Sequence, residues 1–158
     1  TRYNLDGFVV GTMRQDPVIE CYSQLFRNGG IESVSGSAIR RSDARILGAN
    51  VEREAIKALR RFCLSLGAME VHPPIVVGLS ITGVFGLPLV SGHPFGLGDD
   101  REAINDENLI LPEALVESLE FEPSEMLRPL FDMMWNAGGW PCSPFYNDQG
   151  EWHDPAGR

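Results

Sequence analysis

The most apolar stretch of the chain runs from Pro74 to Val84 and reads PIVVGLSITGV. Apolar and β-branched residues occupy both alternating sets of positions in it, which is typical of a strand that is buried on both faces. We therefore expect the central strand of the fold here. A sheet built on such a strand needs cover on both faces, so the pattern favours an α/β arrangement in which the neighbouring amphipathic and apolar segments form the covering layers.

The clearest helical pattern immediately precedes that strand, over residues 50–67. Its apolar residues recur at spacings of three and four, as Val51, Ala55, Leu59, Phe62 and Leu66. Asn50 is a suitable N-cap, and Gly67 is a suitable residue to follow the last turn. Glu52 and Glu54 then fall in the first turn, where the helix dipole favours negative charge.

A second, shorter helix is expected from Pro129 to Asn136, before Gly138 and Gly139. Its inward side chains are predicted to be Leu130, Phe131, Met134 and Trp135. An aromatic tail follows, and its large side chains must pack on another part of the chain.

Three strands are expected at the start of the chain, over residues 5–13, 19–27 and 31–35. Residues 14–17 have turn composition, and Asn28-Gly29 favours a tight hairpin turn. Residues 36–48 lack clear periodicity and predict a surface loop. Leu89-Val90 is expected as an antiparallel neighbour of the central strand, and residues 91–108 as a long exposed loop.

Together these patterns predict one α/β (α+β) domain over residues 1–153. Its sheet is expected to be mixed and mainly antiparallel, with an N-terminal β-meander and two principal helices. Residues 113–121 are compatible with a helix or a strand. Residues 154–158 are expected to be disordered.

Composition narrows the class of protein. The chain is 43% apolar and 22% charged, and it has no run of about 18 apolar residues of the kind that spans a membrane. It begins at Thr1 and shows no secretory signal, so we expect a piece of a longer, cytoplasmic protein. The three cysteines are widely spaced, and neither a disulfide nor a metal site is expected.

The charge is uneven along the chain. Residues 1–70 carry a balance of +2 and residues 71–158 a balance of −11, which together give the net charge of −9. Because contacts to phosphate dominate affinity for nucleic acids, we expect no direct binding of DNA or RNA by this chain.

Candidate chemistry is sparse. Arg40, Arg41 and Arg45 are close enough in sequence to clamp a phosphate or carboxylate, although pairing with the acidic half or with a neighbouring domain explains them as well. His93 lies in the long loop and, with the acidic residues from Asp99 to Glu107, is a candidate for hydrolase or transferase chemistry. No phosphate-binding or dinucleotide motif is present, so no cofactor is expected.

Several framework segments carry a family resemblance: YNLDGF (3–8), QLFRNGGIESV (24–34), RPLFD (128–132), WNAGG (135–139) and SPFY (143–146). In this order they resemble the C-terminal region of bacterial Schlafen-type regulators, whose N-terminal part is an AlbA-type DNA- or ATP-binding module. The AlbA-type module itself is absent from these residues. The resemblance therefore implies an accessory domain of a transcriptional regulator and transfers no catalytic residue.

Three functions remain open at this point. The first is a non-catalytic sensory or interaction domain of a larger cytoplasmic regulator, with the rest of its own longer chain as the expected partner. The second is a small-molecule hydrolase or transferase that uses His93 and the acidic loop. The third is a structural domain that forms a homodimer.

Overall fold

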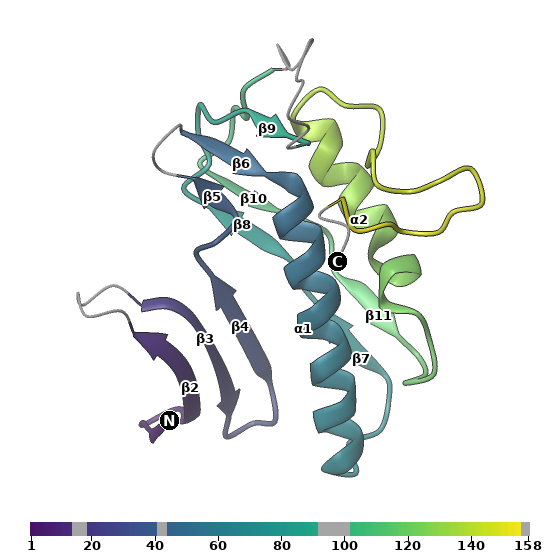
Figure 1. The fold of residues 1–158 in the computed structure, drawn as a ribbon. Helices are drawn as coiled ribbons and strands as arrows, with labels where there is room; N and C mark the ends of the chain where they lie inside the picture. The colour runs from purple at the N-terminus through teal and green to yellow at the C-terminus, as the bar shows by residue number, and fades with distance from the viewer. Residues whose placement is uncertain (14–18, 41–43, 92–101, 156–158) are drawn as a thin grey trace. The chain divides into compact units, whose positions relative to one another are not determined.

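The computed structural model describes residues 1–13, 19–40, 44–91 and 102–155. It has the α+β class expected from the sequence, with an N-terminal β-meander, mainly antiparallel strand pairs and two principal helices (Figure 1). The chain divides into two compact units, Thr1–Ile39 and Arg40–Arg158.

The first unit is an antiparallel sheet with the strand order β1-β2-β3-β4. Its strands are β1 (Arg2–Tyr3), β2 (Gly7–Met13), β3 (Ile19–Phe26) and β4 (Ile31–Ser35). The predicted turn at Asn28-Gly29 is confirmed, because Gly29 has a φ of +88° and its N–H donates to the carbonyl of Phe26. The short strand β1 was not predicted. The predicted turn over residues 14–17 lies outside the described residues.

The second unit contains both helices, α1 (Gly48–Ala68) and α2 (Pro123–Ala137). Helix α1 begins two residues earlier than predicted and has Leu47, not Asn50, at its N-cap, because a strand leads directly into it. Helix α2 begins six residues earlier than predicted, so Pro129 lies inside it. An internal proline costs a helix about 3 kcal/mol, and burial of the α2 side chains offsets this cost. The four side chains predicted to face inward from α2 are all buried.

The predicted central strand is instead one half of a two-stranded ribbon. The ribbon consists of β7 (Ile75–Val77) paired with β11 (Ala114–Val116), followed by β8 (Ser80–Thr82) paired with β10 (Asn108–Ile110). The Leu111 N–H donates to the Leu79 carbonyl between the two pairs. Only alternate side chains of residues 75–82 point inward, and Val76 is 60% exposed. The prediction of burial on both faces is therefore wrong, because helices cover one face of the ribbon (Figure 1).

Two further predictions are corrected near the start of α1. The segment predicted as a loop contains β5 (Ile39–Arg40), at the junction of the two units, and β6 (Arg45–Leu47). The strand β9 (Leu89–Val90) pairs in parallel with β6 and is not an antiparallel neighbour of β8. The parallel pairing is possible because the connection from β6 to β9 crosses over through α1. In this arrangement Ile46 and Leu89 are completely buried in the core.

The core of the second unit lies where α2 and α1 meet. Its most deeply buried large side chains are Ile46, Glu52, Val84, Leu89, Ile104, Phe131, Met134 and Trp135. Among the described residues, neither helix has the length and apolar character needed to cross a membrane.

Candidate functional site

Glu52 is a completely buried carboxylate at 0% exposure, on the face of α1 that points into the core. Its Oε1 accepts hydrogen bonds from Trp135 Nε1 and Ser143 Oγ, both at 2.6 Å. Its Oε2 accepts a hydrogen bond from Trp152 Nε1, also at 2.6 Å. We call these four residues the Glu52 cluster. A buried carboxylate is costly unless its oxygens are satisfied, and here three neutral donors satisfy them.

The helical repeat of α1 explains why Glu52 points inward. The side chains of α1 that face the interior follow spacings of four, three, four and three, as Glu52, Ile56, Leu59, Cys63 and Leu66. Close packing then fixes the position of the Trp135 ring, because an added Cβ on Gly48 would lie 2.2 Å from Trp135 Cζ2. Gly48 therefore allows the indole to reach Glu52.

The environment of Glu52 raises the pKa of its carboxyl above the ordinary value. Burial is the main cause, and the negative charge of Asp132 acts in the same direction. The hydrogen bonds from Ser143, Trp135 and Trp152 act in the opposite direction, because they stabilise the charged form. The pKa nevertheless remains raised, so burial outweighs the three donors.

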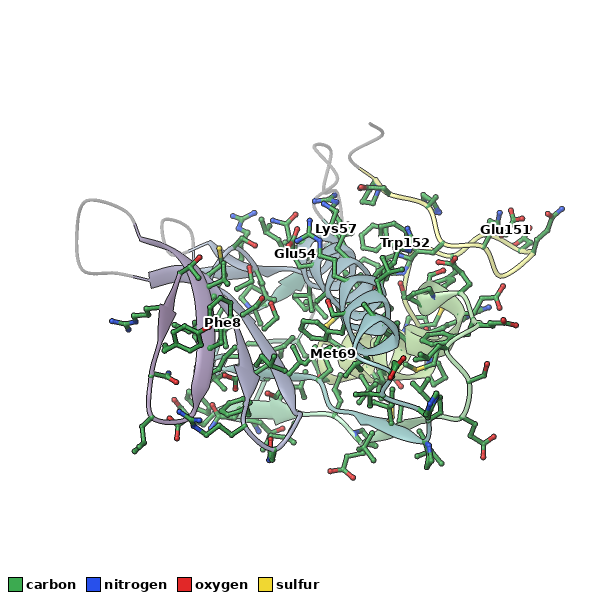
Figure 2. All side chains as sticks on the ribbon, turned by 90° about the horizontal axis from the view of Figure 1, so that it is seen from below. Phe8, Glu54, Lys57, Met69, Glu151 and Trp152 are labelled. Atoms are coloured by element: carbon green, nitrogen blue, oxygen red, sulfur yellow. The ribbon has the colours of Figure 1, made fainter. Side chains whose placement is uncertain are left out.

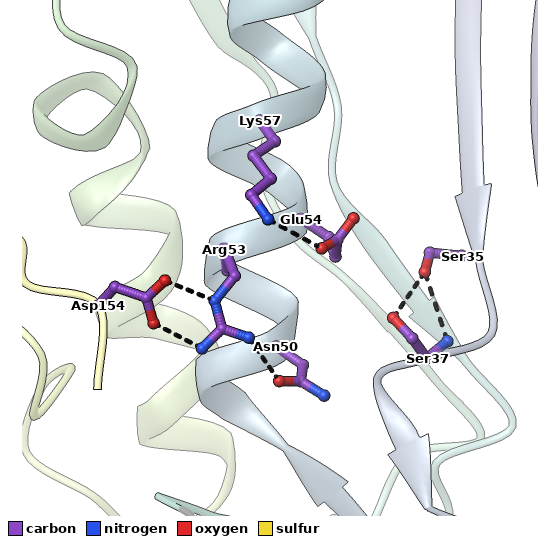
Figure 3. Close-up of polar contacts among 7 residues, drawn as sticks. All are labelled: Ser35, Ser37, Asn50, Arg53, Glu54, Lys57 and Asp154. Atoms are coloured by element: carbon purple, nitrogen blue, oxygen red, sulfur yellow. Dashed lines mark hydrogen bonds and ion pairs between the residues drawn. The ribbon is translucent and has the colours of Figure 1, made fainter. Parts of the chain in front are cut away.

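Arg53, the next residue of α1, makes a second contact with the end of the chain (Figure 3). Its Nε and one terminal nitrogen donate to the two carboxylate oxygens of Asp154 at 2.8 and 2.6 Å, and its other terminal nitrogen donates to Asn50 Oδ1. Asp154 is the first residue of the segment expected to be disordered, and this two-point ion pair fixes its position instead. Residues 156–158 lie outside the described residues.

Together these contacts attach residues 138–155, which we call the C-terminal segment, to the two helices. Figure 2 shows Trp152 beside α1, whereas Glu151 lies farther from the helix, where the segment extends outward. Tyr146 also attaches the segment to α2. Its hydroxyl donates to the carbonyl of Ser124 at 2.6 Å, and the guanidinium of Arg128 lies 4.9 Å from the centroid of its ring. The Glu52 cluster therefore stabilises the structure and presents no free carboxylate oxygen to a substrate.

A surface groove of about 420 Å³ lies on the other half of α1. Helix α1 and the segment that leads into α2 line it, through Arg60, Cys63, Leu64, Gly67, Leu119, Phe121, Glu122 and Pro123. Leu64 lies at its rim and is 72% exposed. The lining is mainly apolar, and its charged residues are Arg60 and Glu122.

The ionisable groups of this groove are poorly suited to catalysis. Arg60 and Glu122 form an ion pair with each other at 2.8 Å. Burial raises the pKa of the Cys63 thiol, which keeps it in the protonated form that is a weak nucleophile. Within the described residues, Cys63 and Cys142 take part in no disulfide.

The candidate binding residues expected from the sequence are only partly described. Arg45 lies exposed on β6, and Arg40 lies on β5 with a side chain outside the described set. Arg41 and His93 both lie outside the described residues. The anion site and the role of His93 therefore stay predictions.

The sequence patterns predict neither the Glu52 cluster nor the groove. The sequence predicts Glu52 only as a dipole partner in the first turn of the helix. One signal for its burial was present, because counting back from Leu66 in steps of three and four reaches Ile56 and then Glu52. Its partners could not be found in this way, since they lie 83 to 100 positions away in the chain.

Comparison of the chain with protein-family models, curated proteins and solved structures finds no match.

Proposed function

We propose that the chain is a non-catalytic interaction or sensory module of a larger cytoplasmic regulator, and that the groove beside α1 receives a partner segment. The groove is the observation that carries this proposal. It combines an exposed leucine, a mainly apolar lining and an ion pair that already satisfies its two charges. Such a surface favours protein contacts over turnover of a small molecule.

The Glu52 cluster supports the same conclusion from the interior. Burial raises the pKa of the Glu52 carboxyl, but its oxygens are occupied by three donors. Two of these donors, Ser143 and Trp152, belong to the C-terminal segment, and the third belongs to α2. A general acid or base must instead reach a proton on its substrate. The resemblance of the framework segments to the C-terminal region of Schlafen-type regulators supports an accessory role.

Affinity purification of the protein from its own cells tests the proposal. A charge placed in the groove by Leu64→Glu should remove a partner that the unmodified protein retains, because it would bury an unpaired carboxylate. Ser65→Glu is the matched control, since Ser65 is an exposed neighbour on α1 that does not line the groove. Equal retention by both variants, or the absence of any retained partner, would count against the proposal.

A further inference from the structure

The outer face of the β7/β11 and β8/β10 ribbon is a second surface with a distinct chemistry. Its cross-strand pairs, which lie away from the helices, are Val76 with Leu115, Ser80 with Ile110 and Thr82 with Asn108. Val76, Leu115 and Ile110 are 60%, 56% and 78% exposed. These three apolar side chains therefore form an uncovered strip on one face of the ribbon.

A bulge places Ile110 and Leu115 on the same face although they are five positions apart in the sequence. The pairings Ser80 with Ile110 and Val77 with Ala114 leave Gly78 opposite both Pro112 and Glu113. The extra residue reverses the alternation, so both apolar side chains point outward. An added Cβ on Gly78 would meet no atom within 4 Å, so the middle of the strip is open.

Exposed acidic residues lie at the ends of the strands β10 and β11, which carry part of the strip. Asp106 and Glu107 precede β10, while Glu113 and Glu117 flank β11, and all four residues are exposed. Residues 102–127 contain eight Asp or Glu and no Lys, Arg or His, whereas the facing strand, residues 75–82, is uncharged. An apolar strip with an acidic border complements a segment that has apolar anchors and basic flanks.

We infer that this outer face binds a positively charged amphipathic segment of another protein. A second copy of the chain fits poorly, because docking the same faces would bring together two acidic borders. The strip between Ile110 and Leu115 is about 16 Å long at the usual rise of a strand. A basic helix of about eleven residues, or three turns, covers that length.

This inference rests on the proposed function in one respect, since it names a partner class for an interaction module. Its experiment is nevertheless separate, because it concerns the ribbon and not the groove. If Leu64→Glu abolishes partner retention while the ribbon variants below have no effect on peptide binding, the proposed function stands and this inference fails.

The test uses fluorescence anisotropy of a labelled amphipathic helical peptide of about 14 Lys and Leu residues. One control peptide carries Glu in place of Lys, and the other carries Ser in place of Leu. We expect the Lys/Leu peptide to bind with a dissociation constant at least about tenfold lower than either control. If the Lys/Ser peptide binds as tightly as the Lys/Leu peptide, general charge attraction explains the binding and the inference is overturned.

Two variants locate the binding on the ribbon. Gly78→Arg places bulk and positive charge in open space, and Ile110→Lys replaces an apolar anchor, so both should raise the dissociation constant at least about tenfold. Ser65→Arg adds the same charge on α1 and should change it less than about twofold. Unchanged binding by both ribbon variants would overturn the inference, as would self-association in sedimentation that Gly78→Arg abolishes.

Discussion

Gly48 shows how one missing side chain determines the packing around the Glu52 cluster. Alanine is preferred over glycine in a helix interior by about 1 kcal/mol, and Gly48, the first residue of α1, would gain at most that amount from replacement by alanine. The added Cβ, however, would lie 2.2 Å from a completely buried Trp135 ring, and overpacking of this kind costs roughly 1 to 3 kcal/mol. We expect a net loss in the free energy of unfolding, measured by urea denaturation.

Gly67→Ala is the matched control in the same helix. Its added Cβ would meet Leu119 at 3.7 Å, an ordinary contact, so we expect stabilisation by up to about 1 kcal/mol. Tryptophan fluorescence is a suitable probe, because Trp135, Trp140 and Trp152 are all in the second unit. Equal effects of the two substitutions would contradict the close packing of Trp135 against Gly48.

Glu52→Gln should destabilise the second unit. The amide nitrogen of Gln cannot accept a hydrogen bond, whereas both oxygens of the carboxyl group can accept one in either protonation state, so an indole N–H of Trp135 or Trp152 would lose its partner. An unsatisfied buried donor costs about 1 to 3 kcal/mol. Glu54→Gln, an exposed neighbour on α1, should change the free energy of unfolding by less than about 0.5 kcal/mol. Urea denaturation near neutral pH measures both changes.

The raised pKa of Glu52 also predicts the sign of a pH effect. The folded state holds this proton more tightly than the unfolded state, for which the ordinary pKa is 4.5. The contribution of this group to stability is therefore complete below that value and is lost as pH rises through the raised pKa. We expect the stability difference between the unmodified protein and Glu52→Gln to shrink as pH rises from 4.5. A difference that grows with pH would mean that the three donors outweigh burial.

At this scale the sequence predicted which residues of α2 face inward but not the role of Glu52. Leu130, Phe131, Met134 and Trp135 follow a helical repeat that apolar character alone reveals. Glu52 follows the equivalent repeat in α1, but a carboxylate near a helix start ordinarily faces solvent. Its burial depends on donors from α2 and the C-terminal segment, which local patterns do not bring together.

At the scale of elements, the ribbon has one buried and one exposed face. Ile81 points inward and is 7% exposed, whereas Val76 points outward. Ile81→Ala should cost about 2 to 5 kcal/mol, and Val76→Ala should cost less than about 0.5 kcal/mol. Urea denaturation of the two variants measures this contrast. Similar losses in the free energy of unfolding for the two variants would contradict burial on one face only and would support the burial on both faces that the sequence predicts.

The same elements show where the hydrophobic pattern was ambiguous. Residues 75–81 are apolar at most positions, so the sequence could not distinguish a doubly buried strand from a ribbon with an apolar outer face. The amphipathic pattern of α1 had no such ambiguity, and the helix was found with its boundaries within two residues. The parallel pairing of β9 with β6 depends on a crossover, which no local signal records.

At the scale of the whole molecule, the balance of −11 from Val71 onward predicts that the chain does not bind nucleic acids. We expect no anisotropy change with single- or double-stranded oligonucleotides at about 0.15 M salt, where non-specific binders show dissociation constants of about 10⁻⁴ to 10⁻⁶ M. Micromolar binding that weakens with salt and disappears when Arg40, Arg41 and Arg45 are replaced would contradict this.

The central claim is that the protein acts by binding a partner at the groove beside α1. Its most direct test places a photo-crosslinking amino acid at Leu64 in the protein in its own cells, with the same residue at Lys57 as the control. Both positions are exposed on α1, but only Leu64 lines the groove. The account predicts a discrete crosslinked product from position 64 and none from position 57. The same products from both positions, or no product from position 64, would contradict it.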